Sequence, residues 1–129
     1  MDADRYERGL KKLLEIDGKA GIKAIEDLKD IAPDIEKILV EYPFGEIYSR
    51  PALDTRSREV AAIAALTALG NAKPQLKVHI HAALNAGCTT DEIVEVILQM
   101  TVYAGFPAAI NALYIAKEVF EGRNLKNKS

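Results

Sequence analysis

Apolar residues recur every three or four positions along most of the chain, and no segment alternates apolar and polar residues as a half-buried strand does. Over the first third of the chain this spacing predicts three helices: 3–17, 19–31 and 34–42. Gly18 separates the first two, because glycine readily adopts the left-handed conformation that ends a helix. Pro43 should end the third helix, since its ring clashes with the preceding turn, so the residues after it are predicted to be irregular.

Four longer helices are predicted over the rest of the chain: 54–69, 74–87, 89–104 and 107–122. Proline is suited to the first turn of a helix, and Pro74 and Pro107 stand at two of these starts. At the start of the predicted helix 89–104, Thr89 and Glu92 form the Thr-x-x-Glu pattern of a capping box. The sequence therefore predicts an all-α fold of about six to seven helices, in a single compact domain over 1–129.

Two of the predicted helices carry apolar residues on more than one face. In 91–104 the stripe that contains Ile93 and Ile97 faces one way, whereas Leu98 and Val102 face nearly the opposite way. Residues 107–116 are apolar almost all round. A domain of this size cannot bury both helices completely, so the pattern predicts self-association through these surfaces.

Composition and charge exclude several classes of protein. The formal net charge is -2 and the pI is about 5.7, which gives no electrostatic basis for binding nucleic acid. The first residues are charged and lack the apolar core of a signal peptide, and no uncharged apolar run is long enough for a membrane span. The single cysteine excludes an internal disulfide, and we expect a cytoplasmic protein.

Two ionisable residues fall within or beside apolar helix faces. On a helical wheel Glu59 lies about 40° from Ile63, and His79 lies about 60° from Leu76. A carboxylate and an imidazole from neighbouring helices can form a proton relay, because the carboxylate orients the ring and favours its charged form. The alternative is structural: Glu59 pairs with Arg56 one turn earlier, and His79 binds a backbone carbonyl.

Metal binding is not expected. His79 and His81 are two residues apart and point about 160° apart around a helix, so they cannot hold one ion together. The chain has no third histidine and no cluster of cysteines. We therefore predict no metal site.

The single cysteine, Cys88, directly precedes the capping residue Thr89, and two interpretations stay open. In the first, Cys88 packs against Ile93 as a hydrophobic staple. In the second, the positive N-terminus of the helix activates the thiol for redox chemistry. An external thiol, or Cys88 of the partner subunit, would then have to resolve the oxidised cysteine.

The order of these motifs resembles the carboxymuconolactone decarboxylase family, which includes the alkyl hydroperoxidase D-like proteins. The matching pieces are Arg-x-Arg-Glu at 56–59, a histidine eight residues before Gly87, Gly-x-Thr-x-x-Glu-Ile at 87–93, and Tyr-Ala-Gly-x-Pro-Ala-Ala at 103–109. The resemblance implies an all-α fold of the alkyl hydroperoxidase D-like type. It also implies a homotrimer or homohexamer that acts on a small-molecule substrate.

The family core corresponds to 54–121, with N-terminal helices and a loop over 1–53 and a polar tail over 123–129. In the peroxidase branch of the family, a Glu and a His at the places of Glu59 and His79 serve a Cys-x-x-Cys pair. That pair would fall near positions 72 and 75, where this chain has alanine and glutamine, so the dithiol peroxidase mechanism is absent.

Three functional hypotheses follow. The first is a lyase without a cofactor, in which His79 supported by Glu59 is the acid-base group. Four residues are candidates for binding an anionic substrate: Arg56, Arg58, Lys77 and Tyr114. For the three basic residues, the alternative is an ordinary position on the exposed surface. Tyr114 stands where some related decarboxylases carry a polar or basic residue.

The second hypothesis is an antioxidant oxidoreductase with peroxiredoxin activity through Cys88, and the third is a non-catalytic oligomer.

Overall fold

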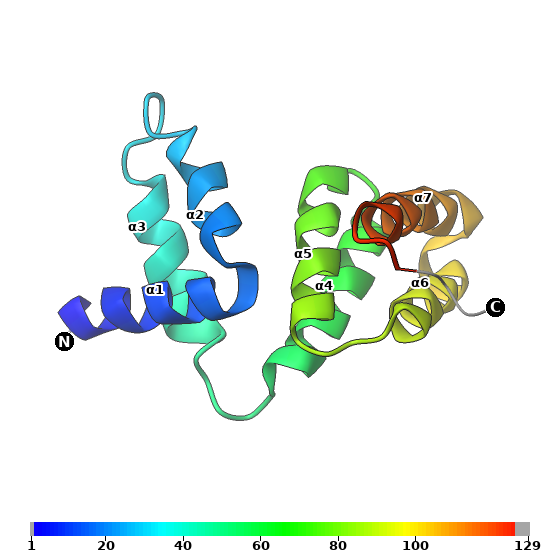
Figure 1. Ribbon diagram of the computed structural model, residues 1–129, viewed down its shortest axis with the longest axis horizontal. Coiled ribbons are helices and arrows are strands. Elements are labelled where there is room, and N and C mark those ends of the chain that lie inside the picture. Colours follow the sequence, from blue (N-terminus) through cyan, green and yellow to red (C-terminus); the bar gives the residue numbers. More distant parts are fainter. Residues whose placement is uncertain (1, 126–129) are drawn as a thin grey trace. The chain divides into compact units, whose positions relative to one another are not determined.

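The computed structural model describes residues 2–125, which form helices and connecting turns with no strand in that range (Figure 1). The prediction of an all-α fold is therefore confirmed. Seven α-helices and one π-helical segment lie within these residues: α1 (Asp2–Asp17), α2 (Lys19–Glu26), α3 (Ile35–Leu39), η1 (Val40–Ile47), α4 (Thr55–Leu69), α5 (Lys73–Asn85), α6 (Thr90–Ala104) and α7 (Phe106–Gly122). Positions 126–129 of the predicted polar tail lie outside the described residues.

The helices divide into two compact units, Met1–Thr55 and Arg56–Ser129. The first unit contains α1 to η1 and the second contains α4 to α7. The organisation of the whole chain as one domain stays a prediction. None of the helices described has both the length and the apolar content that crossing a bilayer requires.

In the first unit, α1 lies directly against η1 because glycines stand at the contact. A Cβ atom on Gly9 would collide with the carbonyl oxygen of Val40, and one on Gly45 would lie 2.5 Å from the carbonyl oxygen of Arg5. The two backbones can therefore approach more closely than larger residues would allow. Five buried side chains form the apolar centre of this unit: Leu13, Ile16, Ile25, Val40 and Phe44.

The prediction that Pro43 ends a helix is wrong. Pro43 lies inside η1, where the backbone N–H of Tyr48 donates to the Pro43 carbonyl at 2.7 Å, five residues back. We attribute this to the wider π-turn, which relieves the clash between the proline ring and the carbonyl four residues earlier. Two arginines of α1 also bind η1 carbonyls: Arg5 donates to Glu41 at 3.2 Å and Arg8 to Gly45 at 2.8 Å.

In the second unit, every helix begins and ends within two residues of its predicted position. The predicted capping box is present, with the Glu92 N–H donating to Thr89 Oγ1 at 3.0 Å and the Thr89 N–H donating to Glu92 Oε1 at 2.8 Å. All four helices contribute to one apolar core, whose largest fully buried members include Ile63, Ile80 and Ile97. This core holds α4 and α5 in fixed positions, and these helices carry the candidate catalytic residues.

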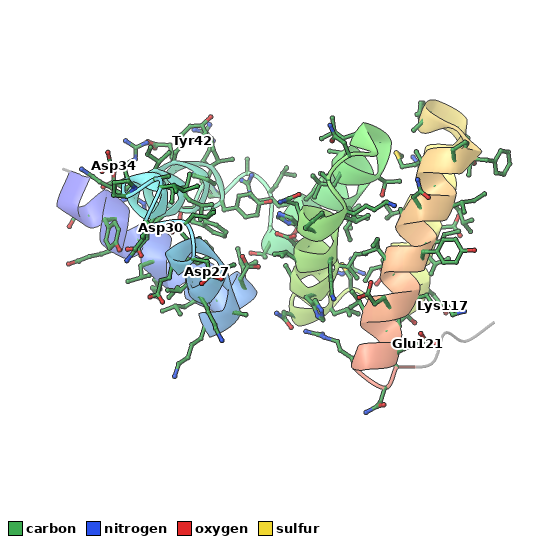
Figure 2. All side chains as sticks on the ribbon, turned by 90° about the horizontal axis from the view of Figure 1, so that it is seen from above. Asp27, Asp30, Asp34, Tyr42, Lys117 and Glu121 are labelled. Atoms are coloured by element: carbon green, nitrogen blue, oxygen red, sulfur yellow. The ribbon has the colours of Figure 1, made fainter. Side chains whose placement is uncertain are left out.

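Several exposed side chains mark the surfaces of the two units. The acidic residues Asp27, Asp30 and Asp34 are exposed on the first unit, and Lys117 and Glu121 are exposed on α7 of the second (Figure 2). Large apolar side chains are also exposed along α6 and α7: Leu98, Val102, Tyr103, Phe106, Ile110 and Tyr114. This agrees with the sequence pattern, in which both helices are apolar on more than one face.

Candidate active site

The structure brings Glu59 and His79 together. Glu59 lies on α4 and His79 on α5, and their Oε1 and Nδ1 atoms are 2.7 Å apart. The Glu59 side chain is completely buried, whereas that of His79 remains 25% exposed. The helical positions that place both residues on apolar faces thus produce a pair with one member in the core and the other reaching the surface.

The direction of this hydrogen bond depends on the ionisation of the carboxylate. An ionised Glu59 can only accept, in which case Nδ1 of His79 donates to Glu59 Oε1. The second oxygen, Glu59 Oε2, is also buried and accepts no hydrogen bond from the described residues. A buried carboxylate with one donor is costly, so most of its compensation must come from His79. Nε2, the ring nitrogen that Glu59 does not engage, is the one suited to exchange a proton with a substrate.

Arg56 binds Glu92 on α6, so the alternative pairing of Glu59 with Arg56 is not what the structure contains. The guanidinium group meets Glu92 Oε2, while Oε1 of the same carboxylate completes the capping box. Hydrogen bonds from Arg56 and from the Thr89 backbone lower the pKa of Glu92 to about 2. Glu92 thus connects the first turn of α4 with the first turn of α6. Sequence reasoning found Glu92 only as a capping residue, because its partner is 36 positions away.

The other candidate binding residues lie on α4, α5 and α7. Lys77 forms an ion pair with Glu118 on α7, with 2.9 Å between Nζ and Oε1. Tyr114 is an exposed residue of α7, and no hydrogen bond or ion pair among the described residues joins Lys77 or Tyr114 to Glu59 or His79. Arg58 is half-buried on α4, immediately before Glu59.

Cys88 is buried, with 5% of its surface exposed, in the core that also contains Ile93. Its backbone N–H donates to the Ala83 carbonyl at 2.9 Å, which fixes the turn between α5 and α6. This placement favours the packing interpretation over the redox one, because a reactive thiol needs access to its substrate.

His81 lies apart from the candidate site. Burial lowers the pKa of its ring, and the positive charges of Arg123 and Lys77 lower it further. No group of three potential metal ligands occurs within the described residues.

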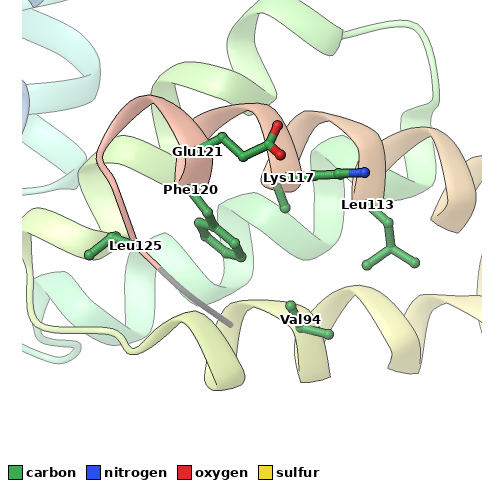
Figure 3. Close-up of a pocket in the computed structure, with 7 residues that line it drawn as sticks. Val94, Leu113, Lys117, Phe120, Glu121 and Leu125 are labelled. Atoms are coloured by element: carbon green, nitrogen blue, oxygen red, sulfur yellow. The ribbon is translucent and has the colours of Figure 1, made fainter. Parts of the chain in front are cut away.

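A groove of about 570 Å³ lies between α6 and α7, and it is not lined by Glu59 or His79 (Figure 3). Its apolar walls include Val94, Leu113 and Phe120, and Lys117 and Glu121 also line it. Sequence reasoning did not find this groove, although the apolar spacing of α7 was the available signal. We consider the Glu59–His79 pair the better candidate for chemistry, because the groove contains no hydrogen-bonded acid-base pair.

An all-helical unit with a buried carboxylate bound to a histidine is the arrangement that the motif order led us to expect. Residues 33–118 match the sequence profile of the carboxymuconolactone decarboxylase family. The chain is 37% identical to a 4-carboxymuconolactone decarboxylase of Acinetobacter baylyi over 93% of this chain and 90% of that protein. This chain therefore belongs to the carboxymuconolactone decarboxylase family.

Two further relatives have names that say less or sequences that are less similar: the first is uncharacterised, and the second has a lower identity to this chain. An uncharacterised 15.0 kDa protein of Paracoccus denitrificans is 38% identical over 72% of this chain and 70% of its own length. A nitrosuccinic acid decarboxylase of Metarhizium robertsii is 25% identical over 88% of this chain and 79% of its own length. Two relatives are thus named as decarboxylases, of two different substrates.

Proposed function

We propose that this protein is a decarboxylase that removes CO₂ from a small carboxylated substrate, with acid-base chemistry carried by its own side chains and without a cofactor. The observation that supports this most is the 2.7 Å hydrogen bond between buried Glu59 and partly exposed His79. The names of two relatives support the same class of reaction.

In the proposed reaction, the bond between a substrate carbon and its carboxylate breaks, and the electron pair stays on the substrate, delocalised into a conjugated carbonyl group. Protonated His79 then delivers its Nε2 proton to that carbon, and the neutral ring keeps the Nδ1 proton that Glu59 accepts. One proton from solvent restores the ring, so each turnover consumes one proton and releases CO₂. Glu59 favours the charged ring before the transfer and fixes its orientation throughout.

We infer that the substrate is a carboxylated lactone of the 4-carboxymuconolactone type, because the relative named for that activity aligns with nearly the whole chain. An anionic substrate requires cations near His79. Arg56 stands one turn before Glu59, and Arg58 directly precedes it, so we propose that these two arginines bind the substrate carboxylates. Of the basic candidates, Arg58 has the strongest support, because Arg56 would have to leave Glu92 and Lys77 would have to leave Glu118 to bind a substrate. Tyr114 has weaker support, because no hydrogen bond or ion pair among the described residues joins it to Glu59 or His79.

A redox function through Cys88 has less support than decarboxylation. The thiol is buried in the core, and the chain has no second cysteine to resolve an oxidised form. The proposed decarboxylation needs no thiol, whereas a thiol peroxidase would need an accessible Cys88.

The test offers 4-carboxymuconolactone, and separately peroxide with a thiol donor, to the wild type and to Cys88→Ser. We expect CO₂ release from both proteins at similar rates and no peroxide loss that depends on Cys88. Peroxide consumption by the wild type that disappears in Cys88→Ser, with no CO₂ release from either protein, would contradict the proposal.

We also propose that the protein self-associates through the exposed apolar side chains of α6 and of the first half of α7. Val102, Phe106 and Tyr114 are each at least two-thirds exposed, and a patch of this kind is unusual on a monomer. Light scattering should give a multiple of the monomer mass for the wild type and a lower mass for Val102→Asp. Ile31→Asp, at a similarly exposed position in the first unit, is the matched control and should keep the wild-type mass. A stable wild-type monomer at micromolar concentration would contradict this interface.

A further inference from the structure

A row of polar residues runs along one face of α5, which packs against α7 (Figure 1). The row consists of Lys77, His81 and Asn85, spaced by four positions. Residues of the α7 segment bind both ends of it: Lys77 Nζ lies 2.9 Å from Glu118 Oε1, and Arg123 donates to Asn85 Oδ1 at 2.7 Å. His81 stands between these two contacts, so basic side chains from two helices gather around its ring.

The charges of this cluster are unbalanced. Glu118 is its one acidic member, whereas Lys77, Arg123 and His81 are basic. The imbalance acts on the imidazole, because burial lowers the pKa of His81 and the positive charges of Arg123 and Lys77 lower it further. These charges favour the neutral ring, and an anion bound among them would favour the charged ring instead.

The basic side chains can donate more hydrogen bonds than their protein partners accept. Lysine and arginine each carry several N–H groups, of which Glu118 and Asn85 accept one from each. Within residues 2–125 the ring of His81 has no hydrogen-bond partner. His81 and Arg123 are half-buried and Lys77 is exposed, so an ion from solvent can reach donors that are partly shielded from water. Such a set of donors suits an anion with several acceptor oxygens.

We propose that Lys77, His81 and Arg123 bind a small oxyanion with two negative charges, of the phosphate class, between α5 and the end of α7. The planar guanidinium donates to two of its oxygens, while the His81 ring and the Lys77 ammonium donate to the others. Lys77 is thereby assigned to this ion rather than to the substrate. The site is separate from the candidate active site, because His79 and His81 point about 160° apart around α5.

Nuclear magnetic resonance titration of the two histidine rings tests the site, with sulfate as the probe because it stays doubly charged near neutral pH. Sulfate should raise the pKa of His81 relative to chloride at the same ionic strength, since the bound anion stabilises the charged ring. The pKa of His79 should change little. An unchanged pKa of His81 would overturn the site. A shift confined to His79 would also overturn it, and would place the anion at the candidate active site without affecting the proposed decarboxylation.

Binding calorimetry with sulfate supplies the second arm. Arg123→Gln removes the guanidinium but keeps a group that can donate to Asn85, and should raise the dissociation constant about tenfold. Lys37→Gln, which also removes one positive charge, lies at an exposed position of α3 in the first unit and should keep the wild-type affinity. Far-ultraviolet circular dichroism checks that both variants keep their helices. Equal affinities of the two variants would contradict a site that contains Arg123.

The affinity should also depend on pH through His81. The wild type should bind sulfate more tightly as the pH falls from about 7.5 to about 5.5, because the ring gains the proton that the anion stabilises. In His81→Gln this increase should be absent, whereas Lys37→Gln should keep it. An increase of the same size in His81→Gln would show that His81 does not contact the anion, and would overturn the proposed site.

Discussion

Glu59 is the residue on which the proposed chemistry depends most, because a buried carboxylate is stable only where a donor compensates it. Its contact with His79 supplies that donor, while its second oxygen is buried without one. Burial of the carboxylate lowers the stability of the folded state, and a positively charged His79 ring beside it restores part of that stability. In the proposed mechanism the charged ring is also the form that donates the proton.

Glu59→Gln tests this role, because the amide keeps the size of the side chain but loses its negative charge. We expect turnover to fall by roughly 10² or more. The decline of turnover at alkaline pH should also move to lower pH, since the protonated ring loses its counter-charge. A purely structural role for Glu59 would leave the shape of the pH profile unchanged. Glu95→Gln, the same change at an exposed position of α6, is the matched control and should keep the wild-type profile.

At the scale of single elements, the contact between α1 and η1 depends on the absence of side chains at two glycines. A methyl group at Gly9 would meet the Val40 backbone, which has little freedom to move. We expect Gly9→Ala to lower the free energy of unfolding by about 1–3 kcal/mol in urea denaturation, despite the better helix propensity of alanine. Gly122→Ala, where nothing lies within 4 Å of the new methyl group, is the control and should be neutral or stabilising. Equal stability of the two variants would show that the close approach is not required.

The link between α4 and α6 should depend on pH through Glu92. Its pKa is lowered from 4.5 to about 2, chiefly by Arg56, so the ionised form stabilises the folded state at pH values above about 4.5. This stabilisation is lost as the pH falls from about 4.5 towards 2. In thermal unfolding, the difference between the wild type and Glu92→Gln should be largest near neutral pH and should shrink over that range. A difference that does not change with pH would contradict the ionic role of Glu92.

Most of the second unit was predictable from local sequence, because its helices begin and end at prolines, glycines and a capping box. The pairing of Glu59 with His79 was predicted from their helical positions together with the resemblance to the family. The partners Glu92 for Arg56 and Glu118 for Lys77 did not, since they lie 36 and 41 positions away and depend on how helices pack. The π-helical turn at Pro43 was also missed, because the local rule that proline ends a helix was overridden by contacts between η1 and α1.

At the scale of the whole molecule, the exposed apolar side chains of α6 and of the first half of α7 bear on the proposed self-association. The candidate acid-base pair lies on α4 and α5, so variants of α7 test assembly without removing the proposed acid-base groups.

The central claim is that His79, held by Glu59, donates the proton that replaces CO₂. The most direct test is the turnover number for CO₂ release from 4-carboxymuconolactone by the wild type, His79→Ala and His81→Ala. We predict that His79→Ala loses roughly 10²–10⁴ in turnover, the usual contribution of a general acid, while His81→Ala stays close to the wild type. Wild-type turnover in His79→Ala, or an equal loss in His81→Ala, would contradict the account.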